Sequence, residues 1–180
     1  SRTVKPQYAD QYSLGFFQNL KGQDLEFSCE FYYKDMRNQI DYKEGADLIL
    51  SSFYDSELAF GRGWAYGTEL FIKKQVGKLT GWIGYTLSKS ERKFAEINEG
   101  KTYPATYDRT HDLAIVGIYK LNKSWTFSAN WLYQTGTAIT MPYGKYIIDG
   151  SVVEAYTTRN AFRMPAYHRM DIGITYETQN

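Results

Sequence analysis

The chain has 180 residues, a formal net charge of +1 and a mean hydropathy of −0.52. It contains no run of about 18 apolar residues, which excludes a helical membrane protein. A net charge near zero argues against nucleic acid as the main partner. The single cysteine, Cys29, excludes an internal disulfide framework.

Aromatic residues make up 17% of the chain, with 17 Tyr, 10 Phe and 4 Trp. Barrels of bacterial outer membranes use such residues as girdles at the two membrane interfaces. A soluble β-sandwich rich in tyrosine has a similar composition, so composition alone leaves both classes open.

The first two predicted strands form a hairpin. They span about residues 7–19 and 25–36, and a turn containing Gly22 joins them. The second strand alternates most clearly, since every second residue from Leu25 to Tyr33 is apolar or cysteine and the residues between are mostly polar. This period of two predicts a strand with one apolar face. A long polar loop is expected over about residues 37–62.

The next two hairpins repeat this arrangement. Strands are predicted over about residues 63–74 and 79–89, joined by Val76-Gly77-Lys78, and then over 111–121 and 125–135. Trp82 falls opposite the apolar series of its strand, so the pattern leaves that register open. The strand from His111 is apolar on both faces in its middle, and its lipid face is not assigned. Long loops are expected at about 90–109 and 136–166, before a seventh strand that includes Met170 to Tyr176.

These features together favour an all-β, antiparallel transmembrane β-barrel. Short turns that alternate with long loops, and strands of at least about 9–11 residues, are typical of outer-membrane barrels. An antiparallel sheet with one solvated face gives the same alternation and is the alternative. The predicted polar face carries charges of both signs: Glu26, Glu30, Lys34, Glu69, Lys73, Arg169 and Asp171.

The predicted strand number indicates part of a larger barrel. About seven strands do not satisfy the even number of bacterial single-chain barrels, and open edges would leave backbone groups unpaired in hydrocarbon. The sequence also shows no signal peptide and no closing aromatic strand. We therefore expect residues 1–180 to be a piece of a barrel domain.

Four segments resemble the barrel of TonB-dependent outer-membrane receptors, particularly those of Bacteroides-like bacteria. Val4-Lys5-Pro6-Gln7 with Tyr12-Ser13-Leu14-Gly15-Phe16 resembles one barrel strand of this family, and Tyr66-Gly67-Thr68-Glu69-Leu70 resembles another. Tyr107-Asp108-Arg109-Thr110-His111-Asp112-Leu113 is similar to the start of a third strand. Pro165-Ala166-Tyr167-His168-Arg169-Met170-Asp171-Ile172-Gly173 is similar to a late segment. In order and spacing they cover nearly the whole chain.

The resemblance implies a late part of a 22-stranded barrel in the outer membrane of a Gram-negative bacterium. The whole receptor would import a scarce nutrient, such as a siderophore, vitamin or glycan, through a barrel closed by an N-terminal plug. The plug and the terminal strands are expected to lie outside this chain. Expected partners are membrane lipid, the TonB complex acting through the plug, a small-molecule or glycan ligand and a surface lipoprotein. No cofactor is expected.

The residues do not indicate an enzyme or a metal site. Adjacent residues of a strand point to opposite faces, so His111 and Asp112 are not expected to pair. Wall salt bridges of Arg109 with Asp112 and of Arg169 with Asp171 are the simpler interpretation. The two histidines are far apart in sequence, and no carboxylate–histidine spacing typical of a metal site is present. An outer-membrane hydrolase therefore ranks last among the functions considered.

The long loops hold the candidate ligand contacts, because aromatic surfaces with a few polar groups suit ligand capture. The candidates are Tyr54, Phe60, Trp64, Tyr103, Tyr107, Tyr143, Tyr156, Arg159 and Asn160. The alternative is that these side chains pack the loops together or belong to the outer girdle. The alternative function is a small structural or adhesive barrel that acts through its loops.

Overall fold

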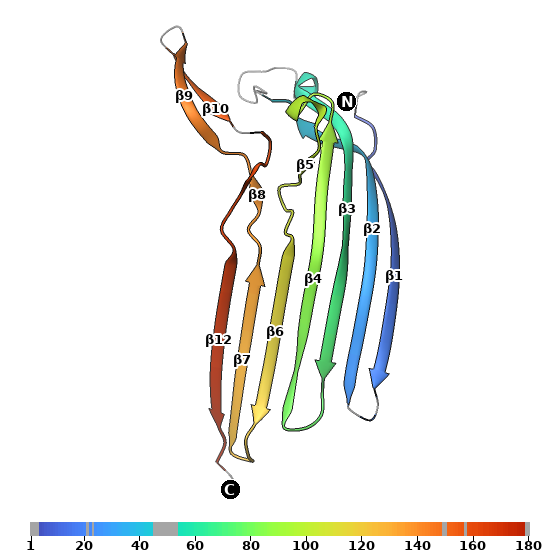
Figure 1. Cartoon of the computed structure of the whole chain (residues 1–180), viewed down its shortest axis with the longest axis vertical. Helices are drawn as coiled ribbons and strands as arrows, with labels where there is room; N and C mark the ends of the chain where they lie inside the picture. Colours follow the sequence, from blue (N-terminus) through green and yellow to red (C-terminus); the bar gives the residue numbers. More distant parts are fainter. Residues whose placement is uncertain are drawn as a thin grey trace.

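The main feature of the computed structural model is one long, antiparallel sheet (Figure 1). The model describes residues 4–20, 22, 24–44, 54–148, 151–156 and 158–178. The strand order is β1-β2-β3-β4-β6-β7-β12. These strands are β1 (Tyr8–Leu20), β2 (Leu25–Tyr42), β3 (Leu58–Lys74), β4 (Leu79–Phe94), β6 (His111–Lys120), β7 (Trp125–Gln134) and β12 (Tyr167–Tyr176). The seven predicted strands correspond to these seven, so the all-β antiparallel prediction is confirmed.

Short elements gather at one end of the sheet. Two 3₁₀ turns lie there, η1 (Tyr54–Glu57) and η2 (Asn98–Gly100), together with β5 (Tyr103–Pro104), which pairs with β4. Two small ladders join β8 (Ala138–Ile139) to β11 (Phe162–Arg163) and β9 (Pro142–Ile148) to β10 (Ser151–Tyr156). In Figure 1 the β9–β10 hairpin projects beyond the sheet at the upper end, where the long connections lie, whereas the tight turns lie at the lower end. The first long connection joins β2 to β3, the second joins β4 to β6 and the third joins β7 to β12.

The strand register places the apolar side chains on one continuous face, which we call the apolar face. Across the sheet one row joins Phe16, Cys29, Leu70, Tyr85 and Leu113. The register also resolves the strand from His111, because Leu113 and Ile115 share this face and Trp82 lies on the other. Many of its large side chains are exposed, as expected for a surface that contacts lipid acyl chains.

The opposite face, the polar face, carries the charges predicted for the barrel interior. Glu26 lies directly opposite Lys73, and their charged groups are 3.8 Å apart. The predicted ion pair of Arg169 and Asp171 is confirmed, with nitrogen and oxygen 3.0 Å apart. The direct Arg109–Asp112 bridge is wrong: Arg109 donates to the side chain of Gln134, which donates to the Asp112 carboxylate at 2.8 Å.

A β-bulge changes the alternation of β2. The register with β3 shifts between Met36 and Gln39, where Asn38 has a φ of 54°. The extra residue turns the following side chains over, so that Asp41, like Gln39, lies on the polar face. Asn tolerates this left-handed conformation better than most residues do.

The strands on either side of the first long connection are longer than predicted. β2 continues to Tyr42 instead of ending near residue 36, and β3 begins at Leu58 instead of residue 63. β4 likewise extends to Phe94 rather than 89. The bulge at Asn38 interrupts the alternation of β2, and the extension of β4 is mostly polar, so alternation does not mark these strand ends.

The most buried residues lie at the loop end rather than in the middle of the sheet. Ala59, Phe94, Ile97 and Tyr103 form a small buried cluster there. Gly61 permits it, because a Cβ at this position would approach the Phe94 ring to 2.6 Å. The cluster thus fixes β5 and η2 against the upper ends of β3 and β4. Within the described residues no helix has the length and apolarity needed to span a membrane.

Candidate functional site

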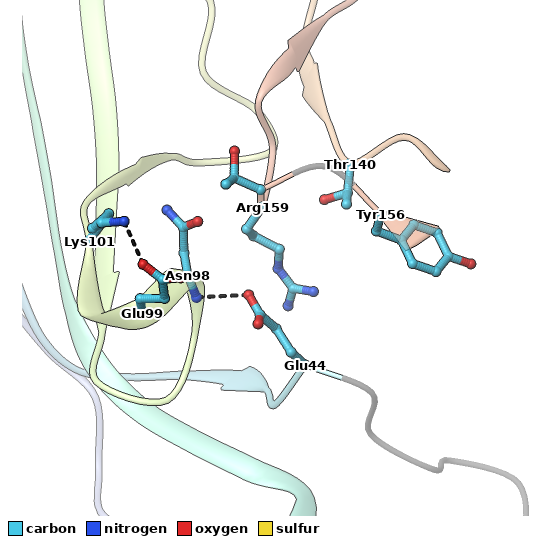
Figure 2. A pocket seen from close by; sticks show the side chains of 8 residues that line it. Glu44, Asn98, Glu99, Lys101, Thr140, Tyr156 and Arg159 are labelled. Atoms are coloured by element: carbon cyan, nitrogen blue, oxygen red, sulfur yellow. Dashed lines mark hydrogen bonds and ion pairs between the residues drawn. The ribbon is translucent and has the colours of Figure 1, made fainter. Parts of the chain in front are cut away.

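A cavity of about 490 Å³ opens among the three long connections (Figure 2). The end of β2, the η2 turn and the third connection each contribute to its wall. Its lining residues are Glu44, Asn98, Glu99, Lys101, Thr140, Tyr156, Thr158 and Arg159. We call it the mouth pocket. Hydroxyl, amide and charged groups therefore surround one exposed aromatic side chain, Tyr156.

The η2 turn is bent so that its polar groups reach the mouth pocket. Asn98 and Glu99 have φ values of 54° and 53°, and Gly100 follows with 72°. The backbone N–H of Asn98 donates to the Glu44 carboxylate at 2.7 Å, which ties the second connection to the end of β2. Lys101 forms an ion pair with Glu99, as Figure 2 shows. The ammonium group of Lys101 also holds the pKa of Glu99 below its usual value.

Asp41 anchors the third connection to the sheet. Its carboxylate lies 2.7 Å from the Arg159 guanidinium and 3.7 Å from that of Arg92. The Tyr103 hydroxyl donates to the same carboxylate at 3.3 Å, and Arg159 also donates to the Tyr42 carbonyl at 3.2 Å. Burial raises the pKa of Tyr103 to about 12, and the negative charge of Asp41 acts in the same direction.

Asn160 holds the second and third connections together. Its side-chain amide donates to the Pro104 carbonyl at 2.9 Å and to the Thr106 hydroxyl at 3.3 Å. The Asn160 backbone N–H in turn donates to the Thr140 hydroxyl at 3.0 Å. The residue is buried and has a φ of 52°, which suits Asn. Its groups are thus engaged in positioning the loops.

Asp108 and Arg163 form a second anchor at the base of the loops. Asp108 is 2% exposed, and its carboxylate accepts from the Ser90 backbone N–H at 2.6 Å and from Arg163. Arg163 also donates to the carbonyls of Asp108 and Gly136, at 2.8 and 3.0 Å. A buried carboxylate needs such compensation, because an unpaired buried charge is costly.

The charges of the mouth pocket balance. Glu44 and Glu99 face Lys101 and Arg159, and each cation already has a carboxylate partner. A strongly anionic ligand would therefore have to displace existing ion pairs. The other lining groups are the hydroxyls of Thr140, Tyr156 and Thr158 and the amide of Asn98.

A smaller hollow of about 260 Å³ lies on the polar face. Its lining includes Glu30, Glu69 and Asp112, and Glu30 is directly opposite Glu69 in the ladder. Like charges in directly opposed positions destabilise a sheet. Within the described residues neither Glu30 nor Glu69 forms an ion pair, so this row offers two carboxylates to whatever fills the barrel.

The residues predicted to contact a ligand lie in different parts of the structure. Tyr156 and Arg159 line the mouth pocket, while Tyr103 and Asn160 hold its wall. Phe60 and Trp64 fall on the opposite side of the sheet, in register with the apolar face. Tyr107 is exposed on the second connection and Tyr143 on the β9–β10 hairpin. The side chain of Tyr54 lies outside the described residues. The ligand-binding role of the whole set stays a prediction.

Several residues that shape the site did not stand out in the sequence. Asp41, Arg92 and Arg163 are single charged residues in polar stretches, and their partners lie tens of residues away. Only Asp108 belonged to a recognised motif. The Asp149-Gly150 dipeptide between two apolar runs was a usable signal for the β9–β10 hairpin.

The ring of His111 lies against that of Tyr85. His111 and the Tyr85 hydroxyl are 2.8 Å apart, and their rings stack. Tyr85 lies in the apolar row, whereas Asp112 bonds on the polar face, so the predicted separation of His111 from Asp112 is confirmed. No group of three metal-binding side chains occurs in the described part of the chain.

Comparison with known proteins agrees with this architecture. Residues 2–180 match the family model described as TonB dependent receptor-like, beta-barrel. No curated protein matches the sequence. The solved structure of the ferric-catecholate import receptor Fiu from Escherichia coli K12, in its closed form, is similar, with a TM-score of 0.62 and 16% identity. The match covers 98% of this chain and 22% of that one.

The fold and the family match together define the class of protein. The chain forms part of the wall of an outer-membrane receptor barrel. The chain belongs to the TonB-dependent receptor β-barrel family. Members of this family are outer-membrane transporters of Gram-negative bacteria rather than enzymes. The chain spans about a fifth of the length of Fiu, and at 16% identity that likeness concerns the fold alone.

Proposed function

We propose that this chain is one section of the barrel domain of a receptor that binds a scarce nutrient and imports it. The family match over residues 2–180 is the observation that supports it most strongly. The mouth pocket, at the end of the sheet where the long connections gather, is the proposed place of first ligand contact. A siderophore, a vitamin and a glycan are the substrate classes considered.

A plug domain outside residues 1–180 would complete the receptor and connect it to TonB. The opposed Glu30 and Glu69 support this proposal, because cationic side chains of a plug would neutralise them. Membrane lipid against the apolar face and a surface lipoprotein over the loops complete the proposed set of partners. The proposed source, a Bacteroides-like bacterium, rests on the sequence motifs alone.

The intact mass of the native gene product in the outer-membrane fraction tests this proposal first. A mass several times 20.9 kDa is expected for a receptor with a plug and a full barrel. A native mass of 20.9 kDa would contradict it and would favour the alternative, a small structural or adhesive barrel that acts through its loops.

Growth tests address transport directly. A strain lacking the gene, or lacking TonB, is expected to grow poorly on one scarce source among ferric siderophores, cobalamin and oligosaccharides. The gene with His111→Ala and His168→Ala is expected to restore growth, because neither ring serves a reaction. Normal growth of the deletion strain on every source would contradict the import function.

A further inference from the structure

The apolar face ends at its loop side in three ordered rows of side chains. The first row holds Tyr12, Tyr33 and Tyr66, which the register places side by side. Two residues further along the strands the row is Asp10, Asp35, Trp64 and Glu91. The row beyond that holds the cations Arg37, Arg62 and Lys93, which we call the cation row. Aromatic, acidic and basic side chains thus follow one another toward the loops.

The tyrosine row marks the level of the membrane interface. Tyr33 and Tyr66 stack at 6.5 Å between ring centroids, and Tyr12 is exposed. Amphipathic aromatic rings collect at the headgroup level of a bilayer. Two steps of two residues take the cation row about 13 Å further along the strands, or about 10 Å along the membrane normal at usual barrel tilt. That distance places the cation row at the outer side of the headgroup layer.

Positive charge in the cation row exceeds the negative charge that it contacts. Arg37 lies 2.8 Å from Asp10 and 3.1 Å from Asp35, and Arg62 lies 3.1 Å from the same Asp35 carboxylate. Lys93 stands directly opposite Arg62 and has no carboxylate partner in the described part of the chain. The two carboxylates therefore pair with the two arginines and leave Lys93 unpaired among the described residues. The like charges of Arg62 and Lys93 oppose each other unless an anion lies between them.

The bulge opens a hollow beside these cations. A depression of about 360 Å³ is lined by Arg37, Asn38, Phe60, Gly61 and Arg62. Both arginine side chains remain more than half exposed, at 54% and 57%. Guanidinium groups bind phosphate through paired hydrogen bonds, and Phe60 supplies an apolar wall beside them.

We propose that the cation row binds the phosphate group of a lipid in the outer leaflet. Arg62 and Lys93 contact the phosphate, Arg37 supports it, and the acyl chains of the same lipid lie over the apolar face below. The lipid is then a fixed part of the receptor's outer surface, separate from the mouth pocket on the other side of the sheet. This interaction does not depend on which nutrient the receptor imports.

The test uses the complete receptor, purified in detergent, stripped of lipid and titrated with bisphosphorylated lipid A, with bound lipid counted by native mass spectrometry. The double variant Arg62→Gln/Lys93→Gln is expected to bind at least about tenfold more weakly, since it loses charge-assisted hydrogen bonds to the phosphate. The matched control is Lys78→Gln/Lys123→Gln, which removes the same charge at the turn end of the sheet and should bind as the wild type does.

Two further arms identify the chemistry. Lipid A with its phosphates removed is expected to bind the wild type as weakly as it binds the double variant. Excess inorganic phosphate should leave lipid binding largely intact, because the acyl chains contribute as well. Equal binding by the wild type and a folded double variant would overturn the proposal, as would equal binding of the dephosphorylated lipid. Complete displacement by inorganic phosphate would overturn the lipid assignment. If the double variant fails to fold, Lys93→Gln alone takes its place.

Discussion

Single residues decide how the three long connections are held, and Arg159 is the clearest case. It joins the third connection to Asp41 of β2 through an ion pair in which both side chains are about three-quarters buried. Tyr103 and Arg92 meet the same carboxylate from the second connection and β4. The Asp41 carboxylate therefore holds the third connection, the second connection and β4 together.

Arg159→Ala is expected to loosen the mouth pocket without unfolding the sheet. The loss of charge-assisted hydrogen bonds should cost about 1.5–3 kcal/mol locally. Hydrogen exchange of the complete receptor should therefore speed up in β8 and β11 but not in β6 or β7. Lys123→Ala, at the opposite end, serves as the control. Unchanged exchange in β8 and β11 of the Arg159 variant would show that the anchor is not needed.

Tyr103 makes the loop end sensitive to alkaline pH. Its folded-state pKa is raised from 10.0 to about 12 because burial and Asp41 disfavour the phenolate. A raised folded-state pKa means that the stabilisation is complete below pH 10 and is lost as the pH rises from 10 toward 12. The difference in near-ultraviolet phenolate absorbance between wild type and Tyr103→Phe should titrate near pH 12. A difference that titrates near pH 10 would show an ordinary, solvated hydroxyl.

At the scale of elements, two glycines that face each other in β4 and β6 differ in the space available for a side chain. Gly81 has a φ of 148°, and a Cβ there would lie 2.0 Å from the Val116 carbonyl oxygen. Gly117 is directly opposite Gly81 in the ladder, yet a Cβ added there meets nothing within 4 Å.

Gly81→Ala is therefore expected to disturb the β4–β6 ladder, whereas Gly117→Ala should be tolerated. The backbone has to move to relieve the first clash, so the folded fraction of the complete receptor should fall markedly. Heat-modifiable migration on gels measures that fraction. Similar folded fractions for the two variants would contradict the close approach at Gly81.

The elements also show which parts of the fold could be predicted from the sequence. Regular alternation predicted the hairpins and the charged wall, because lipid and lumen impose opposite polarities on successive residues. It did not predict the part of β2 beyond Asn38, because the bulge there moves the following side chains to the opposite faces. The short pairings β5, β8 and β11 have two residues each, too few for any period. The anchors of the mouth pocket were equally out of reach, since they join residues such as Asp41 and Arg159, 118 positions apart.

At the scale of the whole molecule, the sheet is open along two edges. Within the described residues, neither β1 nor β12 has a partner on its outer side, and nearly all their side chains are exposed. Unpaired backbone groups cost several kcal/mol each in hydrocarbon. We expect further strands of the receptor to pair with both edges.

Residues 1–180 expressed alone are therefore expected not to form a stable monomer in detergent. Exposed edges favour pairing between chains, so light scattering should report large or polydisperse species. The complete receptor under the same conditions is the control and should be monodisperse. A monodisperse, heat-modifiable monomer of the isolated chain would show that the sheet closes on itself.

The shared anchors of the loop end bear on attempts to change what such a receptor binds. Asp41 belongs to the first connection's strand, Tyr103 and Asn98 to the second connection, and Arg159 to the third, and each contacts another. A single loop grafted from a relative would lack the side chains of the other two connections that hold it in place. The three connections are therefore held together as one unit, and a transplant should carry all three.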